Sequence, residues 1–213
     1  MMDWLGDGAL PMGFLMFFGM VYAFIKRRAS HKLASRAFPA LADRLGLVHK
    51  PSPYRKGIGT LSGRLGGYRV FVDPDEQKKI SLHFSGHPGV LLRNYEQNQR
   101  PPDGLSRLYS GDKRFDAYFK TRYADEEVSQ RIRAHADWRP LINGLEQEFR
   151  RELVQFNVGE TGVTLVLDFG NPPHIPAWAV ERLLAILRDF ARVIDPETAR
   201  SEAGPGHASE TMP

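Results

Sequence analysis

The stretch LVQFNVGETGVTLVLDF, residues 153–169, decides the fold class. Two runs of alternating apolar and polar residues flank Gly-Glu-Thr-Gly, a composition typical of a β-hairpin turn. Alternate side chains of a strand point to opposite faces of a sheet. The side chains expected on the buried faces are Val154, Phe156, Val158, Val163, Leu165, Leu167 and Phe169. The segment therefore predicts two antiparallel strands with one buried face.

Further strands are predicted upstream of this hairpin. In TLSGRLGGYRVFV, residues 60–72, two glycines separate two strand-like runs, which favours a tight hairpin with Tyr68, Val70 and Val72 on one face. Residues 80–84 alternate as in a half-buried strand, and HPGVLLRNYE, residues 87–96, is expected to continue the sheet. Residues 115–123 also alternate and predict a strand.

Amphipathic helices are predicted around these strands. Ser30–Leu45 carries Leu33, Ala37, Leu41 and Leu45 at four-residue intervals, with Ala34 and Phe38 beside them, and Pro39 is expected to kink or divide it. Asp125 is expected to cap a helix through Ala134, and Asp137 to cap the next one. A last helix begins near Pro176. Its apolar stripe is Leu183, Ile186, Leu187, Phe190 and Val193.

The order of these elements predicts an α+β fold with a mainly antiparallel sheet built from β-hairpins and packed by amphipathic helices. We expect one soluble domain over residues 29–194. A helix followed by a hairpin occurs near residues 30–72 and again near 137–169, which raises the hypothesis of two related halves. Residues 195–213 are small, polar and unpatterned, and predict a disordered tail.

An apolar run, ALPMGFLMFFGMVYAFIKRR, occupies residues 9–28. No charged residue lies between Gly8 and Ile25, and about 18 residues of helix span about 27 Å, close to the hydrocarbon thickness of a bilayer. Apolar side chains surround the helix on all sides, unlike an amphipathic core helix. A cleaved signal peptide would need a basic start and a small-residue cleavage site, which the run lacks. Residues 1–28 therefore predict an N-terminal anchor, a single transmembrane helix that precedes the soluble domain.

The basic residues indicate the orientation of this anchor. No Lys or Arg precedes the run. Five follow it closely, namely Lys26, Arg27, Arg28, Lys32 and Arg36. Because Lys and Arg accumulate on the cytoplasmic side of membrane helices, we expect the N-terminus outside a bacterial inner membrane and the domain in the cytoplasm. The absence of Cys agrees with a cytoplasmic domain.

Positive charge is concentrated after the anchor. The net charge of the chain is +4, yet residues 26–72 hold eleven Lys or Arg and a single acid, Asp43. The simplest interpretation of this excess is that the basic residues near the anchor set its orientation and that the others are solvated side chains on the surface. A sharper interpretation is attraction to anionic lipid headgroups, each basic residue contributing about 1 kcal/mol near such a surface. Nucleic acid is not an expected partner, because the anchor already explains the basic bias.

Chemistry-bearing patterns are weak in this sequence. Without Cys there is no thiol catalysis and no Cys-based zinc site. The glycines of residues 57–67 lack the GK[ST] ending of a phosphate loop. Two candidate groups are interpreted as surface or turn residues, namely the pair His83 and His87 and the group Asp73, Asp75 and Glu76. His174 has a possible carboxylate partner in Asp168, but no Ser in a GxSxG context completes a catalytic triad. No catalytic, cofactor-binding or metal-binding residue is predicted, and we expect no cofactor and no enzymatic activity.

The segment GDKRFDAYFKTRYADEEVSQRI, residues 111–132, carries Phe115, Asp116, Phe119 and Asp125. This pattern resembles uncharacterised bacterial membrane-anchored proteins of the domain-of-unknown-function type, which have FDxxFxV followed by Asp. Thr121 stands where an aliphatic residue is common. The resemblance implies no known activity. The Phe-Asp pair also has a purely structural explanation, a core Phe next to an Asp that caps a helix or forms a turn.

Three functions remain open at this stage. The first is a non-enzymatic accessory module that binds an unidentified protein partner at the inner membrane. The alternative is a membrane-tethered domain that binds a lipid or small ligand. A deep pocket with converging polar groups would favour the ligand, and a flat apolar patch would favour the partner. A hydrolase using His83, His87 or His174 is the remaining hypothesis.

Overall fold

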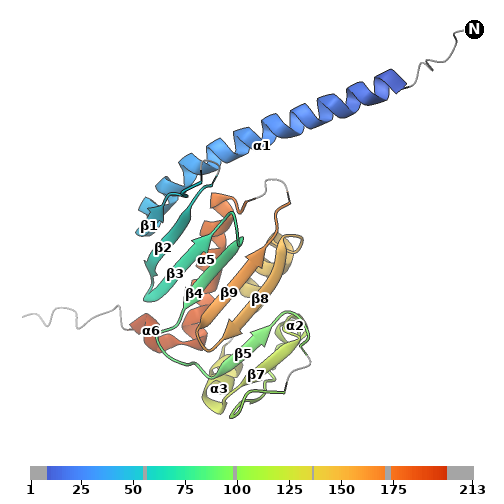
Figure 1. Cartoon of the computed structure of the whole chain (residues 1–213). Coiled ribbons are helices and arrows are strands. Elements are labelled where there is room, and N and C mark those ends of the chain that lie inside the picture. The colour runs from blue at the N-terminus through green and yellow to red at the C-terminus, as the bar shows by residue number, and fades with distance from the viewer. Residues whose placement is uncertain (1–8, 55–56, 98–99, 136, 171–173, 201–213) are drawn as a thin grey trace, which may run out of the picture.

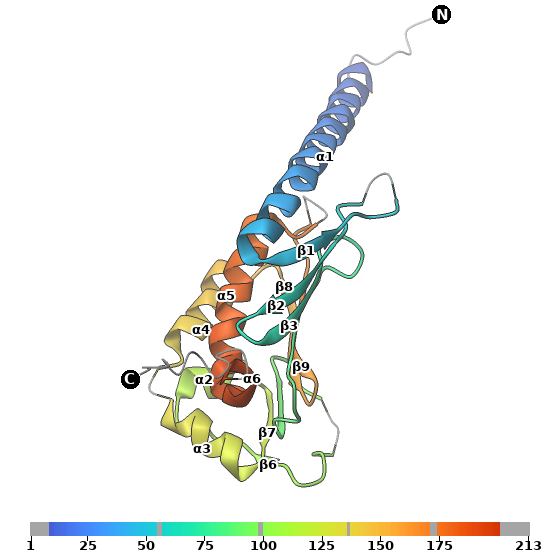
Figure 2. The same ribbon diagram turned by 90° about the vertical axis from the view of Figure 1, so that its left-hand side faces the viewer.

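One antiparallel sheet runs through the domain, and helices cover one of its faces (Figures 1 and 2). The computed structural model describes residues 9–54, 57–97, 100–135, 137–170 and 174–200, without the side chains of residues 9–15, 23–28, 30–31 and 200. The strands are β1 (Leu47–Lys50), β2 (Thr60–Leu65), β3 (Tyr68–Asp73), β4 (Lys79–His83), β5 (Val90–Arg93), β6 (Ser106–Arg107), β7 (Thr121–Ala124), β8 (Leu153–Gly159) and β9 (Gly162–Leu167). The helices are α1 (Ala9–Leu45), α2 (Lys113–Tyr118), α3 (Glu126–Ala134), α4 (Arg139–Asn143), α5 (Ala177–Ile194) and α6 (Pro196–Arg200), and a π-helical turn, η1 (Gly144–Glu148), continues α4.

The sheet has nine strands in the order β1-β2-β3-β4-β9-β8-β5-β7-β6. Every pair is antiparallel, which confirms the predicted α+β class with a mainly antiparallel sheet. The β8–β9 hairpin lies between β4 and β5, so residues 87–96 join the sheet beside β8 and β7 instead of continuing from β4. The relation between two halves of the domain stays a prediction.

The two faces of the sheet differ in polarity. Helices α2–α5 lie on one side of it (Figure 2), where Val70, Leu82 and Leu165 are buried. On the opposite face a polar row crosses the central strands. Ser81 Oγ lies 3.3 Å from Thr164 Oγ1, and Arg93 donates a hydrogen bond of 3.1 Å to Asn157 Oδ1. An antiparallel sheet can leave such a face to solvent.

The hairpin at residues 153–169 is confirmed as β8 and β9, with the turn at 159–162. One side chain departs from the predicted alternation. A bulge between Leu153 and Gln155 shifts the register, so Val154 is 54% exposed while Phe156 and Val158 are buried. An extra residue in one strand reverses the faces of those before it.

The earlier hairpin is confirmed as β2 and β3, and Tyr68, Val70 and Val72 are buried on one face. The turn requires glycine. Gly66 and Gly67 have φ angles of +60° and +88°, and a Cβ on Gly67 would lie 2.2 Å from the carbonyl oxygen of Thr198. The turn therefore packs directly on α6.

Helix α1 is a single helix of 37 residues, whereas the sequence predicts an anchor and a separate helix that Pro39 kinks or divides. Pro39 lies inside α1, and the boundary expected at residue 29 falls within it. The buried stripe also differs from the prediction. It consists of Ala34, Phe38, Leu41 and Ala42, while Leu33 is 68% exposed. Four-residue steps drift about 40° each around an α-helix, so Leu33 and Leu45 cannot share one narrow face.

The strand predicted over residues 115–123 is wrong for its first half, which forms α2. The Asp112 side chain accepts hydrogen bonds from the backbone N–H groups of Arg114 and Phe115 and starts the helix. Phe115 and Phe119 are both buried. Their four-residue spacing fits one turn of a helix and equally the two-residue period of a strand, which explains the wrong prediction. Only Thr121–Ala124 is a strand, β7.

The predicted helix caps are only partly confirmed. Asp125 caps α3, accepting a hydrogen bond of 2.8 Å from Val128 N–H. Trp138 occupies the cap position of α4, and Asp137 instead accepts a hydrogen bond of 2.9 Å from Arg139 N–H. The last long helix begins directly after Pro176, as expected.

The prediction of a disordered tail from Asp195 onward is wrong for its first residues. Residues 196–200 form α6, and Asp195 and Thr198 are buried. The Tyr68 hydroxyl donates a hydrogen bond of 2.7 Å to the Asp195 carbonyl, and Thr198 Oγ1 accepts one of 3.0 Å from Ser85 N–H. These contacts attach the end of α5 to the sheet. The rest of the predicted tail, residues 201–213, lies outside the described residues.

Candidate functional site

The N-terminal part of α1 extends beyond the sheet and the other helices in both views (Figures 1 and 2). Its described side chains form an exposed apolar segment, defined here as Met16–Tyr22, with Phe17 63% and Met20 69% exposed. Among the side chains that the structure describes, no helix is long and apolar enough to cross a membrane. No described part of the domain covers this segment, although it carries large apolar side chains.

The C-terminal part of α1, by contrast, is attached to the domain. Phe38 and Leu41 are fully buried in its core. Arg44 Nη2 forms an ion pair of 2.7 Å with Glu181 of α5. Because the two parts belong to one helix, the domain fixes the direction in which the exposed apolar segment leaves it.

The predicted basic flank is only partly described. Lys26, Arg27 and Arg28 lie in α1, but their side chains are outside the description. Lys32 and Arg36 are exposed on the same helix. Further exposed basic residues from the same part of the sequence are Lys50, Arg64 and Arg69. None of these five forms an ion pair with a described residue, so positive charge beside α1 is left uncompensated.

The histidines and the acid considered as catalytic candidates from the sequence lie in different surroundings. His83 and His87 are exposed, and His174 is buried. Asp168 bonds Lys78 Nζ at 2.6 Å and Gly170 N–H, and the Lys78 contact is the main cause that lowers the pKa of its carboxyl. No three His, Asp or Glu side chains gather into a metal-binding group within the described residues.

The acidic loop at residues 73–76 is a turn. Asp73 Oδ1 accepts hydrogen bonds from the backbone N–H groups of Asp75 and Glu76, at 3.2 and 3.0 Å. Asp75 accepts one from Ile58 N–H and so attaches the neighbouring glycine-rich loop. In that loop a Cβ on Gly59 would lie 2.2 Å from the Lys50 carbonyl oxygen. Close backbone packing explains this glycine without a phosphate ligand.

The Phe-Asp pattern also has a structural role. The rings of Phe115 and Phe119 lie 4.7 Å apart in the core. Asp116 Oδ1 accepts hydrogen bonds from Ser110 N–H and Ser110 Oγ, at 3.1 and 3.0 Å. Core packing and turn formation therefore account for these residues, and the resemblance that they carry stays a hypothesis.

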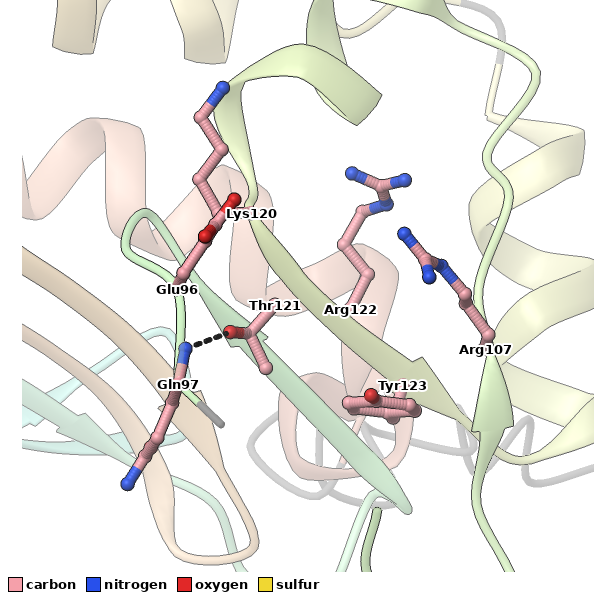
Figure 3. A pocket seen from close by; sticks show the side chains of 7 residues that line it. All are labelled: Glu96, Gln97, Arg107, Lys120, Thr121, Arg122 and Tyr123. Atoms are coloured by element: carbon pink, nitrogen blue, oxygen red, sulfur yellow. Dashed lines mark hydrogen bonds between the residues drawn. The ribbon is translucent and has the colours of Figure 1, made fainter. Parts of the chain in front are cut away.

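A basic pocket of about 210 Å³, here called the β7 pocket, lies at the edge of the sheet (Figure 3). Its lining residues are Glu96, Gln97, Arg107, Lys120, Thr121, Arg122 and Tyr123. Arg107 comes from β6, Lys120 immediately precedes β7, and Arg122 belongs to β7. Thr121 donates to the Tyr95 carbonyl at 2.9 Å and accepts from Gln97 N–H at 3.2 Å, which holds residues 95–97 against β7.

Arg122 is fixed at the base of this pocket. Its side chain is only 10% exposed, and its Nε and Nη1 donate to the carbonyl oxygens of Leu108, Asp116 and Phe119. The Asp116 carboxylate lies 3.5 Å from Nε. Arg107 and Lys120 are exposed, and neither forms an ion pair with a described residue. The pocket therefore combines one rigid cation with two that lack an acidic partner.

Sequence reasoning does not find the β7 pocket. Arg107 and Lys120 lie on either side of α2, and the pairing of β6 with β7 brings them together. The strand predicted over residues 115–123 places Lys120 and Arg122 in regular alternation, without the turn between α2 and β7 that shapes the pocket. A density of basic residues in the sequence would have been the only signal, and it points instead to residues 26–72.

A second pocket, of about 420 Å³, lies beside η1. Its lining residues are Asn94, Tyr118, Leu145, Glu146, Gln147, Arg150 and Leu153. The buried Tyr118 hydroxyl has no hydrogen-bond partner among the described residues, and burial raises its pKa above the usual value, with Glu146 adding to the effect. A π-helical turn and the β8 bulge both border this pocket, and both are irregularities frequent at binding sites.

Comparison with known proteins gives little family information. No family model and no curated protein matches the chain. Among solved structures, the chain is similar to the mycobacterial trehalose monomycolate transport factor A, TtfA, with a TM-score of 0.44 and 12% sequence identity. The match covers 76% of this chain and 96% of that one.

Proposed function

We propose that the protein is a single-pass protein of the bacterial inner membrane, with the N-terminal part of α1 in the bilayer. The supporting observation is the exposed apolar segment Met16–Tyr22 on a helix that projects from the domain. Exposed apolar surface costs roughly 25 cal/mol per Å², so a contiguous run of this kind indicates a lipid or protein environment. The uncharged sequence from Gly8 to Ile25 has the length for lipid.

The proposed orientation places the domain in the cytoplasm. Every Lys and Arg near the apolar run follows it, and Lys32 and Arg36 are exposed where α1 reaches the domain. Positive charge at this level favours the cytoplasmic side and the anionic headgroups found there. The basic residues of β1–β3 lie on the part of the domain beside α1 and would add to this attraction.

For the domain itself we propose a non-enzymatic accessory role, binding a protein partner at the membrane. The linings of the two pockets described above hold charged, amide and hydroxyl groups suited to binding. A second candidate is small-ligand binding, which the 420 Å³ pocket with the unpartnered Tyr118 hydroxyl favours, because ligand pockets usually exceed about 300 Å³.

Membrane fractionation of the full chain tests the anchor. The double variant Phe17→Asp/Met20→Asp should move the protein from the alkali-resistant membrane fraction to the soluble one, because each Asp at the centre of a span costs about 3 kcal/mol. Leu33→Asp is the matched control, since Leu33 is equally exposed on α1 but lies outside the apolar run, and it should stay with the membrane. Equal membrane retention of the two proteins would contradict the proposal.

The orientation is tested with reporters fused after Pro213. A reporter that is active only in the cytoplasm should be active there, and one that is active only in the periplasm should be silent. The opposite pattern would refute the cytoplasmic placement of the domain. Neutralising Lys26, Arg27 and Arg28 should weaken the preference, because these charges lie nearest the apolar run.

A further inference from the structure

We propose that the β7 pocket binds a phosphate group, either inorganic phosphate or the phosphoryl end of a soluble phosphomonoester. The binding of phosphate does not depend on the membrane proposal, and only the choice of a soluble source over a lipid rests on it. The inference rests on Arg107 from β6 and on Lys120 and Arg122 at the start of β7, three cations that line one small pocket.

The first argument is charge. The three cations share the lining with one carboxylate, Glu96, and the Asp116 carboxylate lies at Arg122 Nε. The ion pair of Asp116 is with Arg122, and no described acid forms an ion pair with Arg107 or Lys120. Figure 3 shows the guanidinium groups of Arg107 and Arg122 directed into the same space. Two cations directed into one space repel each other, and an anion bound between them removes this repulsion.

The second argument is preorganisation. Arg122 is nearly buried, and carbonyl groups at Leu108, Asp116 and Phe119 hold its Nε and Nη1. Its remaining nitrogen, Nη2, makes no hydrogen bond with a described residue. A guanidinium fixed in this way loses little side-chain entropy when it binds an oxyanion.

The third argument is size and shape. A volume of about 210 Å³ is below the roughly 300–1,000 Å³ of pockets for drug-sized ligands, so a single small anionic group fits better than a whole nucleotide. Donors reach the pocket from β6, from the residue before β7 and from β7 itself. The tetrahedral phosphate presents oxygens in several directions and can meet the guanidinium groups of Arg107 and Arg122 together, with the Lys120 ammonium adding positive charge to the lining, whereas a carboxylate presents two oxygens in one plane.

The position of the pocket indicates a soluble ligand instead of a lipid. Strand β7, with which β6 pairs, lies at the end of the domain opposite the free end of α1 in both views (Figures 1 and 2). A headgroup in a membrane that holds the N-terminal part of α1 would therefore be at the wrong end of the domain.

Calorimetric titration of the full chain in maltoside micelles with inorganic phosphate, at pH 8 and constant ionic strength, tests the proposal. We expect saturable binding by the parent protein. Arg107→Gln and Lys120→Gln should each weaken it about tenfold, the loss typical of one charge-assisted hydrogen bond. Arg64→Gln, an exposed arginine on β2 at the other end of the sheet, is the matched control and should bind as the parent does. Absence of saturable binding, or equal weakening by all three variants, would overturn the assignment.

Two further arms distinguish the source of the phosphate. Glycerol 3-phosphate should compete with inorganic phosphate, and acetate at the same concentration should not. Vesicles containing phosphatidic acid should compete no better than neutral vesicles. Competition by those vesicles without competition by glycerol 3-phosphate would overturn the soluble source, and equal competition by acetate would overturn the preference for phosphate.

Discussion

Replacing Tyr68 with Phe should destabilise the domain through a single lost hydroxyl. Tyr68 is fully buried, its ring lies edge-on to Phe84 at 6.3 Å, and its hydroxyl donates to the Asp195 carbonyl at 2.7 Å. Tyr68→Phe keeps the ring but leaves a buried carbonyl without its donor, which costs about 1–3 kcal/mol. For a protein of this size each kcal/mol lowers Tm by about 2–4 °C.

The same substitution should change the dependence of stability on alkaline pH. Burial, and next the Asp195 charge, raise the pKa of Tyr68 above the ordinary value near 10. Above that pH the unfolded chain releases a proton that the folded chain retains, so the free energy of unfolding falls as pH rises. Tyr68→Phe should therefore reduce this alkaline loss, while Tyr118, whose pKa is also raised, preserves part of it.

Urea unfolding of the full chain in maltoside, followed by circular dichroism at pH 7.5 and 10.5, measures both effects. Tyr54→Phe is the matched control, because Tyr54 is exposed and should change stability by less than about 0.5 kcal/mol. If Tyr68→Phe were as stable as Tyr54→Phe, with an equal loss at pH 10.5, the inferred contact between β3 and the end of α5 would be refuted.

Three other predictions test the packing. Phe38→Ala should cost about 3–5 kcal/mol because Phe38 is fully buried, whereas Leu33→Ala, on the exposed side of the same helix, should cost less than about 0.5, both measured by urea unfolding. Truncation after Arg200 should leave Tm nearly unchanged, but truncation after Ile194 should lower it by several degrees, since it removes the contacts of α6; equal Tm values would contradict this. Gly67→Ala should destabilise by more than about 1 kcal/mol, because its φ is positive and the new Cβ meets a backbone oxygen; a neutral effect in the same assay would show that the turn can move.

The regular parts of the fold could be predicted because local patterns specify them. Hairpins such as β2–β3 and β8–β9 carry alternation and turn glycines within a few residues. The error at α2 arises because Phe115 and Phe119 fit both a four-residue helical spacing and a two-residue strand spacing, and the Asp112 cap decides between them. The bulge that exposes Val154 has no glycine or proline to indicate it.

The long-range features could not be predicted in this way. Nothing local indicates that β8–β9 enters the sheet beside β4, and this insertion separates β5 from the earlier strands. The burial of Thr198 depends on Ser85, more than a hundred residues away, so α6 resembles a polar tail in the sequence. The β7 pocket depends likewise on the pairing of β6 with β7, whereas the apolar segment of α1 is a local pattern that the sequence alone indicates.

The continuity of α1 makes the helix a rotational coupling between its two ends. No turn separates Tyr22 in the exposed apolar segment from Ala34 at the edge of the core, and these 12 residues rise about 18 Å. Inserting one alanine between them would turn the domain by about 100° around the helix axis, while seven would turn it nearly two full cycles and almost restore its facing. The number of helical residues between the two ends therefore determines which way the surfaces of the domain face.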